Sequence, residues 1–175
     1  SARKWSAQAT LIQRRSGHSM AQVGSRVFAC GGQGVKKLLK SVECFDLQAG
    51  AWSEACDMKV SRCMFATAVH DPKLYVFGGP GKEGALDTVE VLDPNTGNWS
   101  VLASSIHPHS GGSAVVCGAG KIALLGGALR FAEVYDVSLN VWCEIAALPV
   151  PRTQCGALQV DGELYLVGGV SIKNR

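Results

Sequence analysis

Short apolar runs recur along the chain, and each of them ends in a pair of glycines. Runs of four apolar residues bounded by turn residues are too short for helices, so they predict strands buried on both faces. The runs are residues 27–30, 74–77, 122–125 and 164–167, followed by Gly31-Gly32, Gly78-Gly79, Gly126-Gly127 and Gly168-Gly169. These pairs are 47, 48 and 42 residues apart, which indicates a repeating unit.

Further strands are predicted around each of these runs. A run of small or apolar residues precedes each one, at 20–23, 67–69, 114–117 and 157–160, and a short turn joins the two. The turn in the last copy, Asp161-Gly162, carries the strongest short-range hairpin signal. After the first three glycine pairs the pattern predicts a third strand, at 42–46, 89–93 and 132–136.

A tryptophan marks a fourth strand in each unit. Trp5, Trp52, Trp99 and Trp142 are 47, 47 and 43 residues apart, and each lies 26 or 27 residues before a glycine pair. A unit of about 47 residues that recurs with so little drift is typical of a solenoid, a propeller or an array. The order of the runs predicts four antiparallel strands per unit, which we call a, b, c and d.

An aspartate ends each third strand, six residues before the next tryptophan. Four residues after Asp46, Asp93 and Asp136 come Gly50, Gly97 and Asn140, the residue types that most readily accept a left-handed backbone. We therefore expect each aspartate to hydrogen-bond its own turn and the glycine or asparagine to close it.

These features together resemble the kelch repeat: a glycine pair after a hydrophobic strand, then Val-Glu-x-x-Asp, then Trp, with Arg ten residues later. The resemblance covers essentially all 175 residues. It implies an all-β fold, a kelch-type β-propeller in which each repeat forms one four-stranded antiparallel blade around a central channel. The tryptophans are then expected at buried, equivalent positions between adjacent blades.

The repeat length divides the chain into an incomplete arc of about 3.7 blades. Residues 1–8 are the end strand of a preceding blade, 9–55, 56–102 and 103–145 are blades, and 146–175 are the first two strands of a further blade. Kelch propellers usually close with more blades, and Ser1 is not an initiator methionine, so we expect a piece of a longer polypeptide. An unclosed arc is expected to expose apolar blade faces that are prone to association.

The composition of the chain argues against nucleic acids and membranes as partners. The formal charge of +3 and 18% charged residues include no dense basic run, because Lys36, Lys37 and Lys40 stand alone in one loop. We therefore expect no nucleic-acid partner. Residues 94–120 lack Asp, Glu, Lys and Arg, but their Ser, His, Pro and Gly argue against a membrane segment.

The seven cysteines indicate a compartment. Their number is odd, no C-x-x-C pair occurs and they hold no constant place in the repeat. This pattern favours reduced thiols and a cytoplasmic location over a disulfide framework. Cys30 and Cys117 fall in predicted strands as small core residues, whereas Cys56, Cys63 and Cys155 lie near loops, where redox sensing is the alternative.

Several motifs suggest chemistry but have simpler structural explanations. Residues 79–84 match G-x-G-x-x-G, yet a strand rather than a helix follows them, so no dinucleotide site is expected. His109 lies ten residues after Trp99, where the other units have arginine, so it is the cation of its repeat and not, with His107, a metal ligand. We expect no cofactor and no metal.

Two other patterns receive structural interpretations. The glycosylation acceptor at Asn98 includes Trp99, which is expected to be buried. Three glutamates recur at the same place in each unit, which is typical of framework residues rather than of acid/base catalysts. We expect them to pair with polar backbone groups or with the repeat's cation between blades; they are Glu43, Glu90 and Glu133.

Positions that differ between repeats on loops are the best candidates for binding. The b to c loops and the d to a loops are expected on one face, and in kelch adaptors that resemble this chain these loops form the peptide-recognition surface. The predicted contact residues are Gln33, Lys82 and Arg130 from the b to c loops, and Met64, His109 and Gln154 from the d to a loops. Most of these are cations or neutral donors, which favours a protein or peptide substrate with acidic residues.

The resemblance implies a non-enzymatic interaction module, the substrate-recognition propeller of a BTB-kelch adaptor for a cullin-RING ubiquitin ligase. The BTB region that contacts the cullin in that family is not in this sequence. An actin-associated kelch scaffold is the alternative among binding proteins. A kelch-fold enzyme, an oxidase or a sugar-acid epimerase, is the alternative of another class. The residues do not identify the substrate, the number of blades in the parent protein or its oligomeric state.

Overall fold

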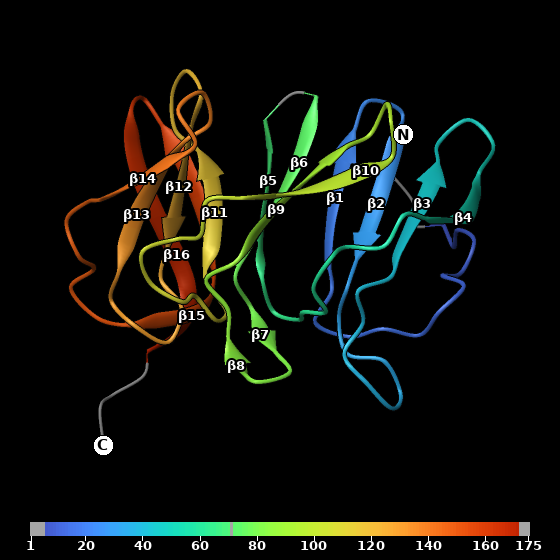
Figure 1. Ribbon diagram of the computed structural model, residues 1–175, viewed down its shortest axis with the longest axis horizontal. Coiled ribbons are helices and arrows are strands. Elements are labelled where there is room, and N and C mark those ends of the chain that lie inside the picture. Colours follow the sequence, from blue (N-terminus) through green and yellow to red (C-terminus); the bar gives the residue numbers. More distant parts are fainter. Residues whose placement is uncertain (1–5, 71, 172–175) are drawn as a thin grey trace.

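Strands and turns make up the part of the chain that the computed structural model describes, residues 6–70 and 72–171, and no helix occurs within it. The strands form successive antiparallel sheets that lie side by side (Figure 1). This arrangement confirms the predicted all-β fold of four-stranded antiparallel blades. Trp5, one of the four predicted anchor residues, lies outside the described residues.

Three sheets have four strands, each in the order a, b, c, d. The first contains β1 (Ser19–Val23), β2 (Arg26–Cys30), β3 (Val42–Asp46) and β4 (Ala51–Ala55). The second contains β5 (Ala66–His70), β6 (Lys73–Phe77), β9 (Val89–Asp93) and β10 (Asn98–Leu102). The third contains β11 (Ser113–Val116), β12 (Lys121–Leu125), β13 (Ala132–Asp136) and β14 (Val141–Glu144).

Two hairpins complete the described structure. β15 (Arg152–Val160) and β16 (Glu163–Ser171) pair antiparallel through the predicted Asp161-Gly162 turn, and both strands are nine residues long. β7 (Pro80–Gly81) and β8 (Gly84–Ala85) form a small hairpin inside the b to c loop of the second sheet. This second hairpin includes Gly81 and Gly84 of the G-x-G-x-x-G match, so part of this b to c loop is paired as strands.

The sheets pack through their first strands and their faces. β1 contacts β5, β5 contacts β11 and β11 contacts β15, so the a strands line the inner side of the arc. Polar side chains join them there: the hydroxyls of Ser19 and Thr67 are 2.7 Å apart. Apolar clusters fill the spaces between sheets; between the first and second sheets the cluster includes Phe28, Leu92 and Trp99.

The tryptophans of the d strands occupy equivalent positions, as predicted. Each indole N–H donates to a backbone carbonyl in the segment that leads into its own sheet, at 2.9–3.0 Å. The pairs are Trp52 with Ala9, Trp99 with Cys56 and Trp142 with Ala103. Because residues 9, 56 and 103 are 47 apart, each ring fixes the same point of the repeat.

The aspartate turns also form as predicted. Oδ1 of Asp46 accepts the N–H groups of Gln48 and Ala49, and the N–H of Gly50 donates to the Asp46 carbonyl. Gly50, Gly97 and Asn140 all have positive φ, at 65°, 73° and 55°. These short turns set the register between the c and d strands.

Candidate binding surface

The loops after the glycine pairs and the segments that connect successive sheets lie on one side of the molecule, the lower edge in Figure 1. Backbone contacts join the two sets. Ser16 forms a β-bridge with Gln33, and Gly127 forms one with Arg152. This confirms the expected common face, which we call the loop face.

A buried arginine supports the loop face in each of the first two sheets. The guanidinium of Arg62 is fully buried and donates to the carbonyls of Gly78 and Thr88 at 2.7 and 3.0 Å. It also pairs with the carboxylate of Glu90 at 2.8 Å. In the first sheet the equivalent arginine makes the same bonds; Arg15 donates to Gly31, Ser41 and Glu43.

His109 takes this place in the third sheet, as its position in the repeat predicted. Its Nδ1 lies 2.7 Å from the carbonyl oxygen of Gly126 and its Nε2 lies 3.0 Å from Glu133. The residue is only 3% exposed. Both ring nitrogens therefore have partners inside the sheet, and His109 does not present its side chain on the loop face as we had expected of a contact residue.

The three glutamates pair with the cations and also accept hydrogen bonds from the backbone of the segments that connect successive sheets. The carboxylate of Glu133 accepts the N–H groups of Ile106 and His107, at 2.8 and 2.9 Å. Glu43 and Glu90 do the same for residues 12–13 and 59–60. Burial alone raises the pKa of Glu133, but the hydrogen bonds from His109 and the backbone outweigh it and hold the pKa below its usual value. These engaged carboxylates are framework groups.

The contact between blades differs from the expected one. The predicted pairing of each glutamate with backbone N–H groups and with the cation of its repeat is confirmed, but each cation and its glutamate belong to one sheet and do not join two blades. The backbone carbonyl of the cation makes the crossing instead: Gly32 donates to Arg62, and Gly79 donates to His109, at 2.8 and 2.6 Å. A Cβ on Gly79 would lie 2.5 Å from the carbonyl oxygen of Cys63, which explains the requirement for glycine.

A row of left-handed residues crosses the loop face from sheet to sheet. It lies two positions after each cation and consists of Gly17, Met64, Gly111 and Gln154, with φ of 58°, 44°, 73° and 57°. The N–H of each later member donates to the carbonyl of the member before it, at 2.7–2.9 Å. A left-handed conformation is strained for methionine and glutamine, and such strain often marks functional positions.

The other five predicted contact residues have exposed side chains on the loop face. Met64 and Gln154 belong to the row itself. Gln33 forms a β-bridge with Ser16 through its backbone, and Lys82 lies in the turn of the β7–β8 hairpin. The guanidinium of Arg130 donates through Nε to the carbonyl of Leu148 at 2.8 Å, which leaves its other N–H groups exposed.

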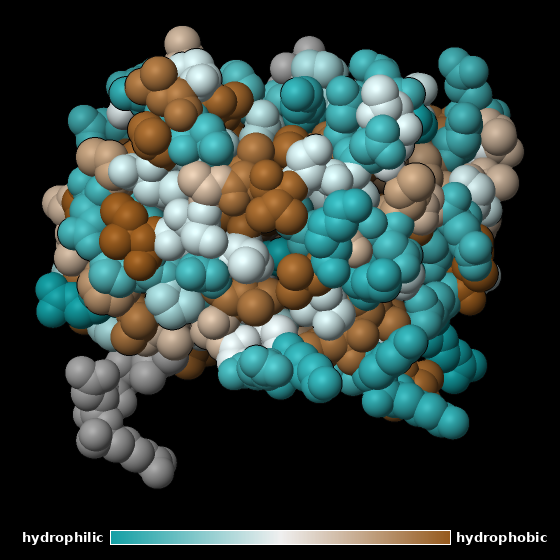
Figure 2. All heavy atoms as spheres, viewed as in Figure 1, coloured by the Kyte–Doolittle hydropathy of each residue, from teal (hydrophilic) through white to brown (hydrophobic). Residues whose placement is uncertain are grey.

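A cleft of about 460 Å³ in the loop face is lined by residues that are not among the six predicted contact residues. Arg14, Lys36 and Lys37 line it together with the exposed side chains of Ile12 and Val35. Figure 2 shows hydrophilic side chains gathered at the lower right, over the 33–41 loop of Figure 1, with hydrophobic ones between them. The Lys36-Lys37 pair was the available signal, but only the fold brings Arg14 beside it.

Other features of the described residues bear on metal binding, membrane insertion and thiol chemistry. Within 6–70 and 72–171 no group of three or more His, Cys, Asp or Glu side chains could hold a metal ion. In the same residues no helix is long and apolar enough to cross a membrane. Burial raises the pKa of the Cys30 thiol to about 12, which fits its predicted place in the core.

Fold and loop face define a class: an arc of a repeat-built β-propeller that presents variable loops on one side. A profile of the KLHDC2/KLHL20/DRC7 Kelch-repeats domain matches residues 1–127. The chain therefore belongs to the kelch-repeat family. The solved structure of YjhT superposes with a TM-score of 0.85 at 19% identity, covering 95% of this chain and 63% of that one, which shows the shared fold.

Three curated relatives are Kelch-like proteins. Kelch-like protein 41a of Danio rerio is 32% identical over 178 residues, which covers 98% of this chain and 22% of the relative. Kelch-like protein 35 of Homo sapiens is 32% identical, covering 94% and 28%. Kelch-like protein 23 of Homo sapiens is 39% identical over 72 residues, covering 41% and 13%. The chain thus spans less than a third of the length of each of these relatives.

Proposed function

We propose that the chain is part of a peptide-recognition propeller that recruits a protein substrate through its loop face, in a BTB-kelch adaptor of a cullin-RING ubiquitin ligase. The contact with the cullin belongs to a BTB region that this sequence does not include. The location is cytoplasmic and the role is non-enzymatic. Similarity to Kelch-like proteins over most of the chain supports the adaptor class.

One observation carries the binding role. Residues that are constant in the repeat are buried beneath the loop face, as the Arg62 and Glu90 pair illustrates with both side chains fully buried. Residues that vary between repeats are exposed on it, as Met64 and Gln154 are. A rigid framework that carries a variable surface is the usual design of a recognition domain.

The charge of the face indicates the kind of substrate. Arg14, Lys36, Lys37, Lys82 and Arg130 are all exposed on the loops. The acidic residues near them are Glu83, beside Lys82 in the β7–β8 turn, and Asp57, which pairs with Lys40. Among the described residues none of these five cations takes part in an ion pair. An acidic peptide in extended or turn form therefore matches the surface.

The experiment is selection of random displayed peptides on the intact chain, followed by affinity measurements. We expect the selected peptides to be acidic, and Arg130→Ala and Gln154→Ala each to weaken them by about 1–2 kcal/mol with little change in melting temperature. Val101→Ala, on an exposed d strand away from the loops, is the matched control. Unchanged affinity in both loop variants, or losses that follow stability, would show that this face is not the binding surface.

The adaptor role needs a separate test in the longer polypeptide. Affinity purification of the complete protein from cells should recover a cullin and a substrate protein together. Arg130→Ala with Gln154→Ala should remove the substrate and leave the cullin, because the two contacts lie in different regions. Recovery of no cullin in any condition would reject the adaptor role while leaving peptide recognition intact.

A further inference from the structure

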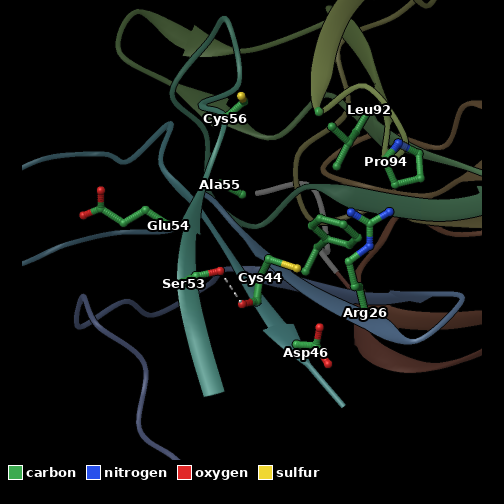
Figure 3. A pocket seen from close by; sticks show the side chains of 11 residues that line it. Arg26, Cys44, Asp46, Ser53, Glu54, Ala55, Cys56, Leu92 and Pro94 are labelled. Carbon is green, nitrogen blue, oxygen red and sulfur yellow. Dashed lines mark hydrogen bonds between the residues drawn. The ribbon is translucent and has the colours of Figure 1, made fainter. Parts of the chain in front are cut away.

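A second cleft lies between the first and second sheets, away from the glycine pairs. Its volume is about 470 Å³, and Figure 3 shows the side chains around it. One wall comes from β2, β3 and β4, with Arg26, Phe28 and Cys44. The other comes from Leu92 and the turn 94–97 of the second sheet. Arg26 begins β2 and the turn 94–97 follows β9, so these groups lie at the strand ends opposite the loop face.

The repeat explains why this cleft is open. The position of Leu92 in the c strand is held by Tyr135 in the third sheet. There the ring packs against Tyr75 and Phe77, with centroids 6.4 and 6.5 Å apart, and its hydroxyl donates to the Asn140 amide oxygen at 2.8 Å.

The second sheet has smaller residues at the positions of Tyr135 and Asn140. Leucine replaces the tyrosine at position 92, and glycine replaces the asparagine at position 97. Phe28 holds the place of Tyr75, so the wall against which a phenol ring would stack is retained. The cleft between the first two sheets therefore lies beside the repeat position that a tyrosine side chain occupies between the second and third sheets.

Two charged groups at the cleft balance each other. The guanidinium of Arg26 lies 5.6 Å from the centre of the Phe28 ring, and in the described chain it belongs to no ion pair. Asp46 is the strand partner of Arg26, and its Oδ1 accepts turn N–H groups, which leaves its second oxygen available. Glu54 also lines the cleft, but Figure 3 shows its carboxylate turned away from Arg26, Leu92 and Pro94.

This balance selects the chemistry of a ligand. An added carboxylate would be repelled by Asp46 and an ammonium by Arg26, whereas a neutral phenol accepts from the guanidinium and donates to the carboxylate. A phenyl ring without the hydroxyl would fill the apolar part beside Phe28 and Leu92 but leave these polar groups unpaired.

We propose that this cleft binds the tyrosine side chain of a partner polypeptide. The ring lies over Phe28 and Leu92, which form the floor of the cleft, and the hydroxyl bridges Arg26 and Asp46. A polypeptide is the occupant because β4, which forms the rim, is the last strand of its sheet and pairs only with β3 in the described chain. Its free edge can pair with an extended segment whose side chain enters the cleft. This site is independent of the loop face.

The test titrates N-acetyl-tyrosinamide into the isotope-labelled 175-residue chain and follows the backbone amide signals by NMR. We expect shifts at Ser53, Ala55 and Gly97 and none on the loop face. N-acetyl-phenylalaninamide should bind about tenfold more weakly, because it lacks the bridging hydroxyl. Equal affinities for the two compounds, or shifts confined to other parts of the chain, would overturn the proposal.

Variants locate the binding further. Leu92→Tyr places in the cleft the tyrosine ring that the third sheet has at this position, and it should weaken the binding of N-acetyl-tyrosinamide at least about tenfold. Arg26→Met keeps the side-chain stem over Phe28 and should lower the affinity for N-acetyl-tyrosinamide to that for N-acetyl-phenylalaninamide. This variant tests the site even if Leu92→Tyr folds poorly. Arg130→Ala on the loop face is the control and should leave both affinities unchanged. Unaltered binding in Arg26→Met would reject the bridging role of the guanidinium and with it the proposal.

Discussion

Two residues on the loop face carry backbone strain that the rest of the row avoids. Gly17 and Gly111 adopt the left-handed conformation without penalty, whereas Met64 and Gln154 adopt it with a Cβ atom. The hydrogen bonds that link the row from sheet to sheet hold them there. Their exposed side chains thus leave the face at fixed angles, as a recognition surface requires.

Removing this strain should stabilise the chain. We expect Met64→Gly to raise the free energy of unfolding by about 0.5–1 kcal/mol, because relief of the left-handed penalty exceeds the added entropy of the unfolded chain. Met20→Gly, at an exposed methionine in the extended β1 strand, should lower it by a similar amount. Urea unfolding measures the free energy of unfolding of both variants. A loss of stability in both would show that Met64 is not strained.

Stability at acid pH should depend on the buried glutamates. The pKa of Glu133 is lowered in the folded state from its usual 4.5, as is that of Glu43, since their hydrogen bonds to cations and backbone outweigh the effect of burial. The unfolded chain therefore binds more protons near that pH, so this stabilisation is complete above pH 4.5 and is lost as the pH falls through the folded-state pKa.

Glu133→Gln should accordingly be less stable than the parent at neutral pH and lose less stability on acidification. Thermal melts between about pH 7 and pH 3 measure both effects. Glu83→Gln, in the exposed turn of the β7–β8 hairpin and in no ion pair among the described residues, is the control and should retain most of the parent profile. Parallel pH profiles for Glu133→Gln and the parent would contradict the assigned role.

Strands and turns were the elements that the sequence predicted best. Glycine pairs, aspartates and tryptophans recur because each has one geometric task in every sheet, so their spacing alone indicated the blades. The β7–β8 hairpin arises from a loop without a repeating pattern, and periodicity could not predict it. The burial of His109 was foreseeable from its repeat position, yet its place in a variable loop suggested a surface contact.

In the first three sheets, both glycines of a pair lie so close to neighbouring atoms that a Cβ would crowd them, and a substitution can separate this steric requirement from the positive φ. Gly79→Ala puts a Cβ 2.5 Å from the carbonyl oxygen of Cys63 and should cost about 3 kcal/mol or more. Gly162→Ala, at φ 85° against 87° for Gly79 but with no atom within 4 Å of the new Cβ, should cost about 1–2 kcal/mol. Equal losses in denaturant melts would mean that conformation alone, and not close packing between sheets, requires the pair.

The arc as a whole has one face that packing has not covered. Tyr75 and Phe77 in β6 are 4% and 0% exposed, whereas Tyr165 and Val167, at the same repeat positions in β16, are 49% and 60% exposed. In the first three sheets a c strand pairs with the b strand, but among residues 6–70 and 72–171 β16 pairs only with β15. An apolar strand with a free edge is a template for association.

The isolated chain should therefore associate with itself in a concentration-dependent way, as the unclosed repeat predicted. Val167→Lys places a charge on the exposed strand and should weaken association about tenfold or more, because pairing would then bury an ammonium group. Val101→Lys is matched to it, since Val101 is 61% exposed but belongs to a complete sheet, and it should change nothing. Sedimentation velocity over a range of concentrations distinguishes the variants. A monomer at all concentrations, or equal effects of the two substitutions, would mean that β16 is not the associating edge and that its apolar residues are tolerated in water.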